Sequence, residues 1–304
     1  MSRDFTPGDL EDIRERIASP HSARRDSRRP DERHESSVTS RIDRGRDSSP
    51  DSRTSDPRSQ NVRTTFYDRD HAYPLRESET RTLIELGRFR VIAAEDFATY
   101  AYSGRSDRMQ EDIRNLVRHG LVRQGTFEGA DASSRELLTL TKSARKLLRS
   151  NRMVPQDQSL YSGFVKPREA NHDADIYRLY QKEAARIEAS GGKNLRVVLD
   201  FELKKKLNRD FATFGTESRE QIAARHGLRV VNGKIPVPDL RIEYETRDGD
   251  QGRVDLELAT EHYRPRQLAE KVHAGFSIYA SSGEADRLRR VLGQRDLTAE
   301  ILTL

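Results

Sequence analysis

The sequence of 304 residues contains no cysteine, and this absence excludes several kinds of site. Disulfide cross-links, thiolate zinc sites and cysteine nucleophiles all require that side chain. Long hydrophobic runs are also missing, since no apolar stretch approaches the roughly 20 residues that cross a bilayer as a helix. Residues 1–20 lack the apolar core of a signal peptide. We therefore expect a cytoplasmic protein with no membrane partner.

Hydrophobic residues are scarce, at 34% of the chain against 35% charged residues. Such a composition is too polar for a well-filled core along the whole length, so we expect a disordered part. We assign residues 1–63 to it as a tail, because Arg, Ser, Asp and Pro dominate there and few apolar side chains are available to offset the entropy of ordering. Its arginines and acids nearly balance, which leaves open a solvated spacer or a nucleic-acid-binding arm.

The whole chain carries a formal net charge of +5 and has an isoelectric point near 9.4. A positive excess favours polyanionic partners such as nucleic acids. An arginine-rich solvated surface explains the same excess, so charge alone does not choose between the two.

Residues 64–150 predict three helices, a β-hairpin and a fourth helix, in that order. The helices are expected at residues 77–86, 94–100, 106–119 and 141–148, and the strands at residues 121–124 and 136–140. This order is typical of a winged helix-turn-helix domain.

The third of these helices has the clearest pattern. Met109, Ile113, Leu116 and Val117 follow one another at i, i+4, i+7 and i+8 and form one apolar stripe. Gly120 ends the helix. The stripe predicts that this helix packs on its predecessors and leaves its other face free.

In a winged helix-turn-helix the third helix enters the major groove, and residues near its N-terminus reach base edges. Arg114 and Arg118 on the free face suit phosphates, whereas Asp107 and Glu111 on the same face repel them. The predicted contacts to double-stranded DNA are Arg105, Ser106, Arg108, Arg114, Arg118 and Arg123. A salt-bridged solvated helix and a protein-docking module are the alternatives.

Residues 172–304 predict a second domain, after a linker over residues 151–171. Helices are expected at residues 173–189, 218–225, 266–273 and 284–292, and strands at residues 195–201, 229–231, 235–237, 240–244, 254–258, 276–280 and 299–304. This order indicates a mixed α/β domain, so the predicted fold class of the chain is α+β.

Carboxylates gather on the long hairpin that we expect around Gly249. Asp239 precedes its first strand, and Asp255 and Glu257 share one face of its second strand. A turn centred near Gly249 puts Asp239 diagonal to Glu257 on the paired strands. The same turn puts Asp255 directly opposite Glu243.

Like charges that face each other across a ladder are unfavourable unless a cation lies between them. Mg²⁺ takes a few oxygen ligands and keeps several waters, so Asp239, Asp255 and Glu257 are candidate ligands. A metal there would polarise a phosphodiester and activate water. The alternative is a polar outer face of the sheet, on which these acids pair with Arg241 and its neighbours.

Other polar residues of this domain predict less. Asp200 and Glu202 follow a strand and are further candidate acids, while the lysine run 204–206 is interpreted as a solvated face. His172 lacks metal-ligand spacing with other histidines and is interpreted as a loop residue.

Asp239 after a proline, followed by Glu257-Leu258-Ala259, resembles the core of the PD-(D/E)xK nucleases. That core carries an acid on one strand and acid-x-lysine on the next, and Ala259 stands at the lysine position. The resemblance implies a metal-dependent DNA endonuclease with Asp239, Glu257 and Lys271 as catalytic residues, Lys271 reaching the site from the next helix. Otherwise it implies a relative that does not cut DNA.

A wider resemblance covers residues 75–304. The stretches that carry it are Gly120-Leu121-Val122, Leu140-Thr141, Pro238-Asp239, Val254-Asp255-Leu256-Glu257-Leu258, and the helix with Leu268 and Lys271. Together they resemble the replication-relaxation family of plasmid and mobile-element proteins. The resemblance implies a role in maintaining or mobilising such elements, with replication or mobilisation proteins as further partners. A non-catalytic regulator and a protein-interaction scaffold stay open as alternatives.

Overall fold

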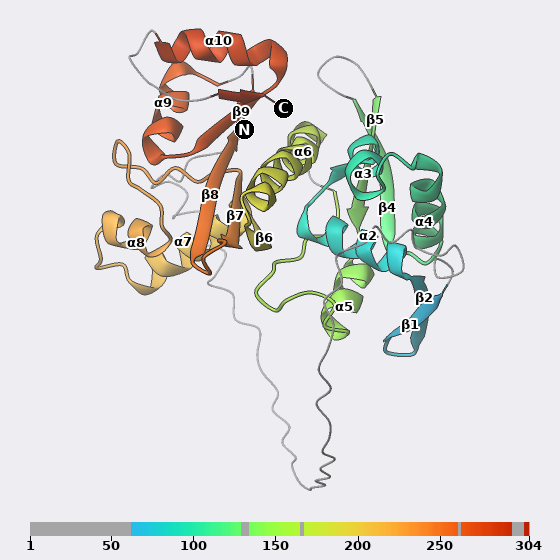
Figure 1. The fold of residues 1–304 in the computed structure, drawn as a ribbon. Helices are drawn as coiled ribbons and strands as arrows, with labels where there is room; N and C mark the ends of the chain where they lie inside the picture. The colour runs from blue at the N-terminus through green and yellow to red at the C-terminus, as the bar shows by residue number, and fades with distance from the viewer. Residues whose placement is uncertain (1–61, 129–133, 165–166, 261–262, 294–300, 304) are drawn as a thin grey trace, which may run out of the picture. The chain divides into compact units, whose positions relative to one another are not determined.

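The computed structural model describes residues 62–128, 134–164, 167–260, 263–293 and 301–303. They form a mixed α+β structure of helices and β-sheets (Figure 1). The tail predicted over residues 1–63 lies outside these residues, apart from its last two positions. Within the described ranges, no helix is both long and apolar enough to cross a bilayer.

A hairpin that the sequence does not announce precedes the first helix. It pairs β1 (Arg63–Asp68) with β2 (His71–Arg76), and Asp68 faces His71 across a tight turn. Most β1 side chains are exposed, so this strand lacks the apolar alternation from which a half-buried strand is predicted.

The expected order of three helices, a hairpin and a fourth helix follows (Figure 1). The helices are α2 (Glu77–Arg88), α3 (Ala94–Ala101), α4 (Ser106–Arg118) and α5 (Lys142–Ser150). The strands β3 (Ile92–Ala93), β4 (Val122–Glu128) and β5 (Ser134–Leu140) form an antiparallel sheet in the order β3-β5-β4. Thr141 caps α5 as predicted, because its hydroxyl accepts a hydrogen bond of 3.1 Å from the Ala144 amide.

Helix α4 buries one face in the core. Met109, Ile113 and Leu116 are buried, as their spacing predicts. The expectation for Val117 is wrong, because 38% of its surface is exposed. It lies one residue, about 100°, round the helix from Leu116 and falls beyond the buried face. Asp112 is buried in its place, and its carboxylate accepts a hydrogen bond of 3.0 Å from the Tyr102 hydroxyl.

The C-terminal part of the chain contains a five-stranded mixed sheet (Figure 1). Its strands are β6 (Lys193–Leu199), β7 (Leu240–Glu245), β8 (Gln251–Leu258), β9 (Ser277–Ala280) and β10 (Ile301–Thr303). Its helices are α6 (Pro167–Ala189), α7 (Asp200–Thr213), α8 (Arg219–Arg225), α9 (Pro265–Ala274) and α10 (Ser282–Gly293). The strand order is β10-β9-β8-β7-β6; β6, β7 and β8 pair antiparallel, and β8, β9 and β10 pair parallel.

The segment between the two parts is shorter than predicted and is held in place. Helix α6 begins at Pro167, a residue suited to a first helical turn, whereas the sequence pattern places its start at residue 173. The Tyr161 amide donates to the Gly87 carbonyl at 2.9 Å, and the Gly163 amide donates to the Leu140 carbonyl at 2.8 Å. The Gln158 side chain donates to the Val197 carbonyl at 3.0 Å.

Helix α7 is not among the predicted elements. The strand expected over residues 195–201 ends at Leu199, and Asp200 begins the helix. Leu203 and Leu207, four residues apart, are buried on one side of α7. The lysine run between them hides this spacing, because it reads as a solvated segment.

The Asn232-Gly233 pair forms the expected tight turn but joins less structure than predicted. Asn232 and Gly233 have φ angles of 52° and 73°, the positive values that a type I′ turn requires. The turn closes a single bridge between Val231 and Lys234 instead of two strands.

The register of β7 and β8 differs from the expected one. Leu240 pairs with Leu256, so the hairpin is centred one residue before Gly249. Asp255 therefore faces Arg241, and its predicted position opposite Glu243 is wrong. The loop is closed by hydrogen bonds between residues 246 and 250, which fixes the centre of the turn.

Both faces of the five-stranded sheet are covered. On one face, Leu240, Ile242 and Leu256 belong to the same core as Tyr177 and Tyr180 of α6. On the other, side chains of β6 and β9 form a core with α7, α8 and α9; its members include Val198, Leu203, Ile222, Leu268 and Ile278. The face that carries the acids is therefore not a polar outer face, because helices cover it.

The contrast between two neighbouring residues of α4 tests this packing. Leu116→Ala should lower the free energy of unfolding by about 3 kcal/mol, because a fully buried leucine leaves a cavity. Val117→Ala, the control, should change it by less than about 1 kcal/mol, since its side chain is partly solvated. Urea denaturation of both variants measures the difference, and equal losses would contradict the observed orientation of α4.

Candidate functional site

The outward face of α4 presents cations to solvent. We define the α4 outward face as Arg105, Ser106, Arg114 and Arg118, all of which are exposed. The Arg114 guanidinium donates to the Gln110 carbonyl at 3.2 Å. Among the described residues, no carboxylate lies within 4.0 Å of any of these three guanidinium groups. The face therefore carries three positive charges that no ion pair occupies.

Glu111, predicted to oppose phosphate, is held by a cation. The Arg76 guanidinium lies 2.6 Å from the Glu111 carboxylate and lowers the pKa of that group by hydrogen bonding and by its charge. Arg108 lies 3.4 Å from the other oxygen of the same carboxylate. Glu111 is thus neutralised locally, while the predicted DNA contact Arg108 lies half-buried in this network.

Arg76 also binds two acids that are completely buried. Its guanidinium lies 3.7 Å from Glu79 and 3.3 Å from Asp112, which belong to α2 and α4. Asn115 of α4 donates to the same oxygen of the Glu79 carboxylate at 2.7 Å, and the Arg76 amide donates to the other oxygen at 2.8 Å. These contacts fix α4 to α2. Of this network, sequence reasoning found only Arg108 and Glu111. The available signal for the rest was an acid in the first turn of α2, Glu79, whose carboxylate accepts the hydrogen bond from the Arg76 amide.

Arg123, the predicted contact of the hairpin, is exposed on β4. Its guanidinium carbon lies 5.7 Å from the centre of the Phe164 ring, within cation–π range. The tip of the hairpin, residues 129–133, lies outside the described residues.

Three predicted catalytic residues converge in the C-terminal part, and we call Asp239, Glu257 and Lys271 the acid–lysine cluster. The Lys271 ammonium, from α9, lies 2.9 Å from the Glu257 carboxylate on β8. It also donates to the Val237 carbonyl at 2.9 Å. The Asp239 carboxylate accepts a hydrogen bond of 3.0 Å from the Leu258 amide. The register of β7 and β8, continued by one pair, sets Asp239 opposite Glu257.

Two further described residues contact this cluster. His172 lies on α6, and its Nε2 is 3.5 Å from the Asp239 carboxylate. The interpretation of His172 as a loop residue is therefore wrong, because α6 begins earlier than its apolar pattern indicates. The Tyr263 hydroxyl donates to the Glu257 carboxylate. No sequence pattern marks Tyr263, since it precedes α9 without a recognisable spacing.

Burial and neighbouring charges shift the pKa values of Asp239 and Glu257 in opposite directions. Burial raises the pKa of Glu257 to about 7, and the nearby Asp239 adds to that effect. Burial alone would also raise the pKa of Asp239, but His172, Lys271 and the Leu258 amide outweigh it and lower the pKa to about 2. The charge of Asp239 raises the pKa of His172 against the opposing effect of burial. The cluster thus holds one firmly ionised acid beside one that binds its proton up to neutral pH.

The donor chemistry of the cluster meets only part of what Mg²⁺ requires. Two carboxylates are present, and Glu257 Oε2 has no hydrogen-bond partner among the described residues. The side chains of Asp239, Glu257 and Lys271 are only 5%, 0% and 2% exposed, which leaves no room for the waters that Mg²⁺ keeps. In the described part of the chain, no group of three or more histidines and acids is placed to hold a metal ion. The arrangement therefore does not fit a hydrated Mg²⁺ ion.

The other candidate acids have cation partners of their own. Both oxygens of Asp255 accept from the Arg241 guanidinium, at 2.6 and 2.9 Å. Asp200 lies 2.9 Å from Lys204, and Glu202 lies 2.8 Å from the ammonium of Lys206. The predicted ligand Asp255 is thus bound to Arg241, as the alternative interpretation of these acids proposed.

The raised pKa of Glu257 predicts an unusual dependence of stability on pH. The folded state binds this proton more tightly than the unfolded chain, so stability falls as pH rises from about 4.5 through about 7. Glu257→Gln matches the neutral acid in shape and removes the effect. Relative to the wild type, its free energy of unfolding should rise by up to about 3 kcal/mol over this interval.

Urea denaturation at a series of pH values measures this difference. Glu77→Gln, whose parent carboxyl is 84% exposed, is the matched control and should follow the wild-type profile. Parallel profiles for the wild type and Glu257→Gln would show that Glu257 ionises normally in the fold.

Comparison with family models, curated proteins and solved structures finds no match to this chain.

Proposed function

We propose that this protein binds double-stranded DNA, with residues 64–150 acting as a winged helix-turn-helix. The observation that carries the proposal is the α4 outward face, where Arg105, Arg114 and Arg118 are exposed without a carboxylate partner in the described residues. Arg105 and Ser106 stand at the N-terminal end of α4, from which such helices reach base edges. Arg114 and Arg118 follow one turn apart along the helix, where they suit phosphates.

The contacts around Arg76 answer the main objection to DNA binding. Glu111 would repel phosphate if its charge were free, but Arg76 and Arg108 bind both of its oxygens. Asp107 is the remaining acid on this side of α4, against three exposed arginines. The balance of charge therefore favours a negatively charged partner. Among such partners DNA also offers a major groove that receives a helix.

We infer that the C-terminal part is a nuclease-like domain that contributes to binding or assembly and does not cleave DNA. The nearness of Glu257 on β8, Asp239 just before β7 and Lys271 on α9 supports the nuclease-like interpretation, and the burial of all three side chains supports a role without cleavage. A role in plasmid or mobile-element maintenance rests on the resemblance to the replication-relaxation family. Replication or mobilisation proteins are the partners that such a role entails.

Metal-dependent cleavage is the second candidate, and one observation favours it. Ala259 stands where the nuclease motif has a lysine. Lys271 supplies an ammonium group from α9 instead, and that group lies 2.9 Å from the Glu257 carboxylate. In nucleases of this kind such a lysine helps to stabilise developing charge. Cleavage would require the cluster to open toward substrate and metal.

Arginine substitutions on α4 test the proposed DNA interface. Arg114→Ala and Arg118→Ala should each weaken binding to duplexes of any sequence, and each should lower the salt slope of log affinity by about 0.9 for the lost phosphate contact. Arg247→Ala, at an exposed position of the β7–β8 turn, is the control and should leave the slope unchanged. Fluorescence anisotropy over a salt series measures both quantities, and unchanged slopes for both α4 variants would reject this docking face.

A plasmid-nicking assay separates the two roles of the C-terminal part. The wild type, incubated with supercoiled plasmid and Mg²⁺ or Mn²⁺, should leave the plasmid intact because the acid–lysine cluster is closed. Metal-dependent nicking that is lost in Glu257→Gln and Asp239→Asn, but kept in Asp255→Asn, would establish the second candidate instead. Asp255→Asn is the suitable control because its parent carboxylate is bound by Arg241.

A further inference from the structure

Helix α5 carries a second row of cations that the proposed function does not use. We define the α5 basic face as Lys142, Arg145, Lys146 and Arg149, which recur at i, i+3, i+4 and i+7 and are all exposed. Such spacing puts Lys142, Arg145 and Arg149 along one side of the helix, with Lys146 about 100° round the axis from Arg145. The helix contains no acidic residue, so no intrahelical ion pair neutralises them.

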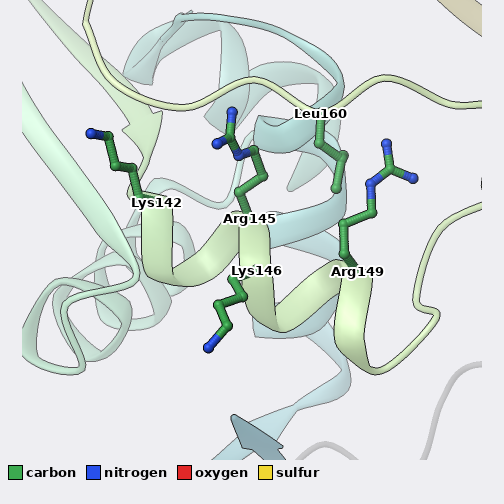
Figure 2. Close-up of a pocket in the computed structure, with 5 residues that line it drawn as sticks. All are labelled: Lys142, Arg145, Lys146, Arg149 and Leu160. Carbon is green, nitrogen blue, oxygen red and sulfur yellow. The ribbon is translucent and has the colours of Figure 1, made fainter. Parts of the chain in front are cut away.

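These side chains border an open hollow. Its volume is about 580 Å³, and its lining consists of the α5 basic face and Leu160. Figure 2 shows Lys142, Arg145 and Arg149 directed to the same side of α5 as Leu160, and Lys146 directed to the other side. Lys146 pairs with Asp68 of β1 at 2.7 Å, so the hollow faces three cations.

Two of these cations are available to a ligand. Within the described ranges, no carboxylate lies within 4.0 Å of Lys142 or Arg145. The Arg149 guanidinium donates to the carbonyls of Pro155 and Gln156 at 3.0 and 3.4 Å, and also to that of Gln158. Neutral carbonyls leave its positive charge in place, so Arg149 orders the rim of the hollow and still attracts anions.

Lys142 stands where a helix disfavours a cation. It is the first residue of α5, close to the positive end of the helix dipole, and the first turn contains no acid to balance it. A cation there adds to a helix end that already favours anions. Lys142 thus goes against the usual preference for acids at a helix N-terminus, and its charge strengthens the attraction of that end for anions.

The C-terminal end of α4 and the N-terminal end of α5 adjoin. The Thr141 hydroxyl donates to the Gly120 carbonyl at 2.7 Å, and the Thr141 amide donates to the Leu121 carbonyl at 3.0 Å. This contact joins the start of α5 to the residues that follow α4. Arg118 is two residues from Gly120 and Lys142 is next to Thr141, so the cations of the two helices lie on either side of one hydrogen-bonded junction.

We propose that the α5 basic face binds the phosphate backbone of the same DNA duplex that α4 reads. Lys142 and Arg149 are separated by about 10 Å along the helix axis, roughly the axial rise of three phosphates on one strand. A membrane surface does not suit this face, because the apolar side of α5, formed by Ala144, Leu147 and Leu148, is buried in the core. The inference rests on the proposed DNA-binding function and extends it to a second helix.

The test removes the two unpartnered charges from the full chain. Lys142→Gln together with Arg145→Gln should lower the salt slope of log affinity for a random-sequence duplex by about 1.8. The loss of affinity between 50 and 200 mM salt should accordingly become about 12-fold smaller than in the wild type. The weakening should be the same for every duplex sequence, because phosphate contacts carry no base information.

Matched controls fix the meaning of each result. Lys142→Arg with Arg145→Lys keeps both charges and should retain the wild-type slope. Lys205→Gln with Arg247→Gln removes two exposed charges elsewhere and should also retain it. Far-UV circular dichroism and the melting temperature verify that α5 is intact, since all substituted side chains are exposed.

Failure of this inference is distinguishable from failure of the α4 interface. If the α4 variants lose affinity and the α5 variant keeps the wild-type slope, the α5 proposal is overturned and the α4 interface stands. If the α5 variant alone loses affinity, the α4 interface is overturned instead. Unchanged DNA binding with lost binding of poly-glutamate would assign the α5 basic face to an acidic protein and overturn the proposal.

Discussion

One buried guanidinium, that of Arg76, determines how the N-terminal part is arranged. It contacts Glu79 of α2 and both Glu111 and Asp112 of α4, and only 8% of its side chain is exposed. Burying such a charge is costly unless it is paired, and removing one partner from a buried network usually costs about 3–5 kcal/mol. The orientation of α4 is therefore set by charge pairing as well as by its apolar stripe. The same contacts offset the charge of Glu111, one of the two acids on the outward side of α4.

The C-terminal part uses buried charge differently. Asp239 is kept ionised by His172, Lys271 and a backbone amide, while the next carboxyl, Glu257, holds a proton up to about neutral pH. Lys271 is shared between the Glu257 carboxylate and a backbone carbonyl. A site that cleaves phosphodiesters must admit a substrate, whereas these groups are buried and contact one another. Their present arrangement stabilises the junction of β7, β8 and α9.

The sequence predicted those features that depend on neighbouring residues, such as the buried faces and the caps of helices. The spacing of Met109, Ile113 and Leu116 gave the buried face of α4, and Thr141 marked the start of α5. Ser218 and Gln221 form the reciprocal cap of α8 that their spacing indicates. Each of these features depends on residues within two turns of the same helix.

What the sequence did not yield depends on contacts between distant residues. The pairing of β7 with β8 differs from expectation by two residues, because the turn is centred one residue earlier and its residues do not by themselves fix that centre. Lys271 was predicted to approach Glu257, but the closure of that site by Tyr263 and His172 needs the packing of α6 and α9. The α5 basic face was not predicted, because its hollow includes Leu160, which lies on the segment that follows α5.

The position of α6 has a mechanical consequence. Its side chains, Tyr177 among them, belong to one continuous hydrophobic core that includes Leu83 of α2 and Leu256 of β8. In a protein of independently folded domains one domain can unfold while the others stay folded, but a shared hydrophobic core prevents this. Helices α2 to α5 and the mixed sheet should unfold in a single cooperative transition, and truncation between them would expose a large apolar surface on each fragment. A displacement of α2 is then transmitted to β8 through packed side chains of the shared core.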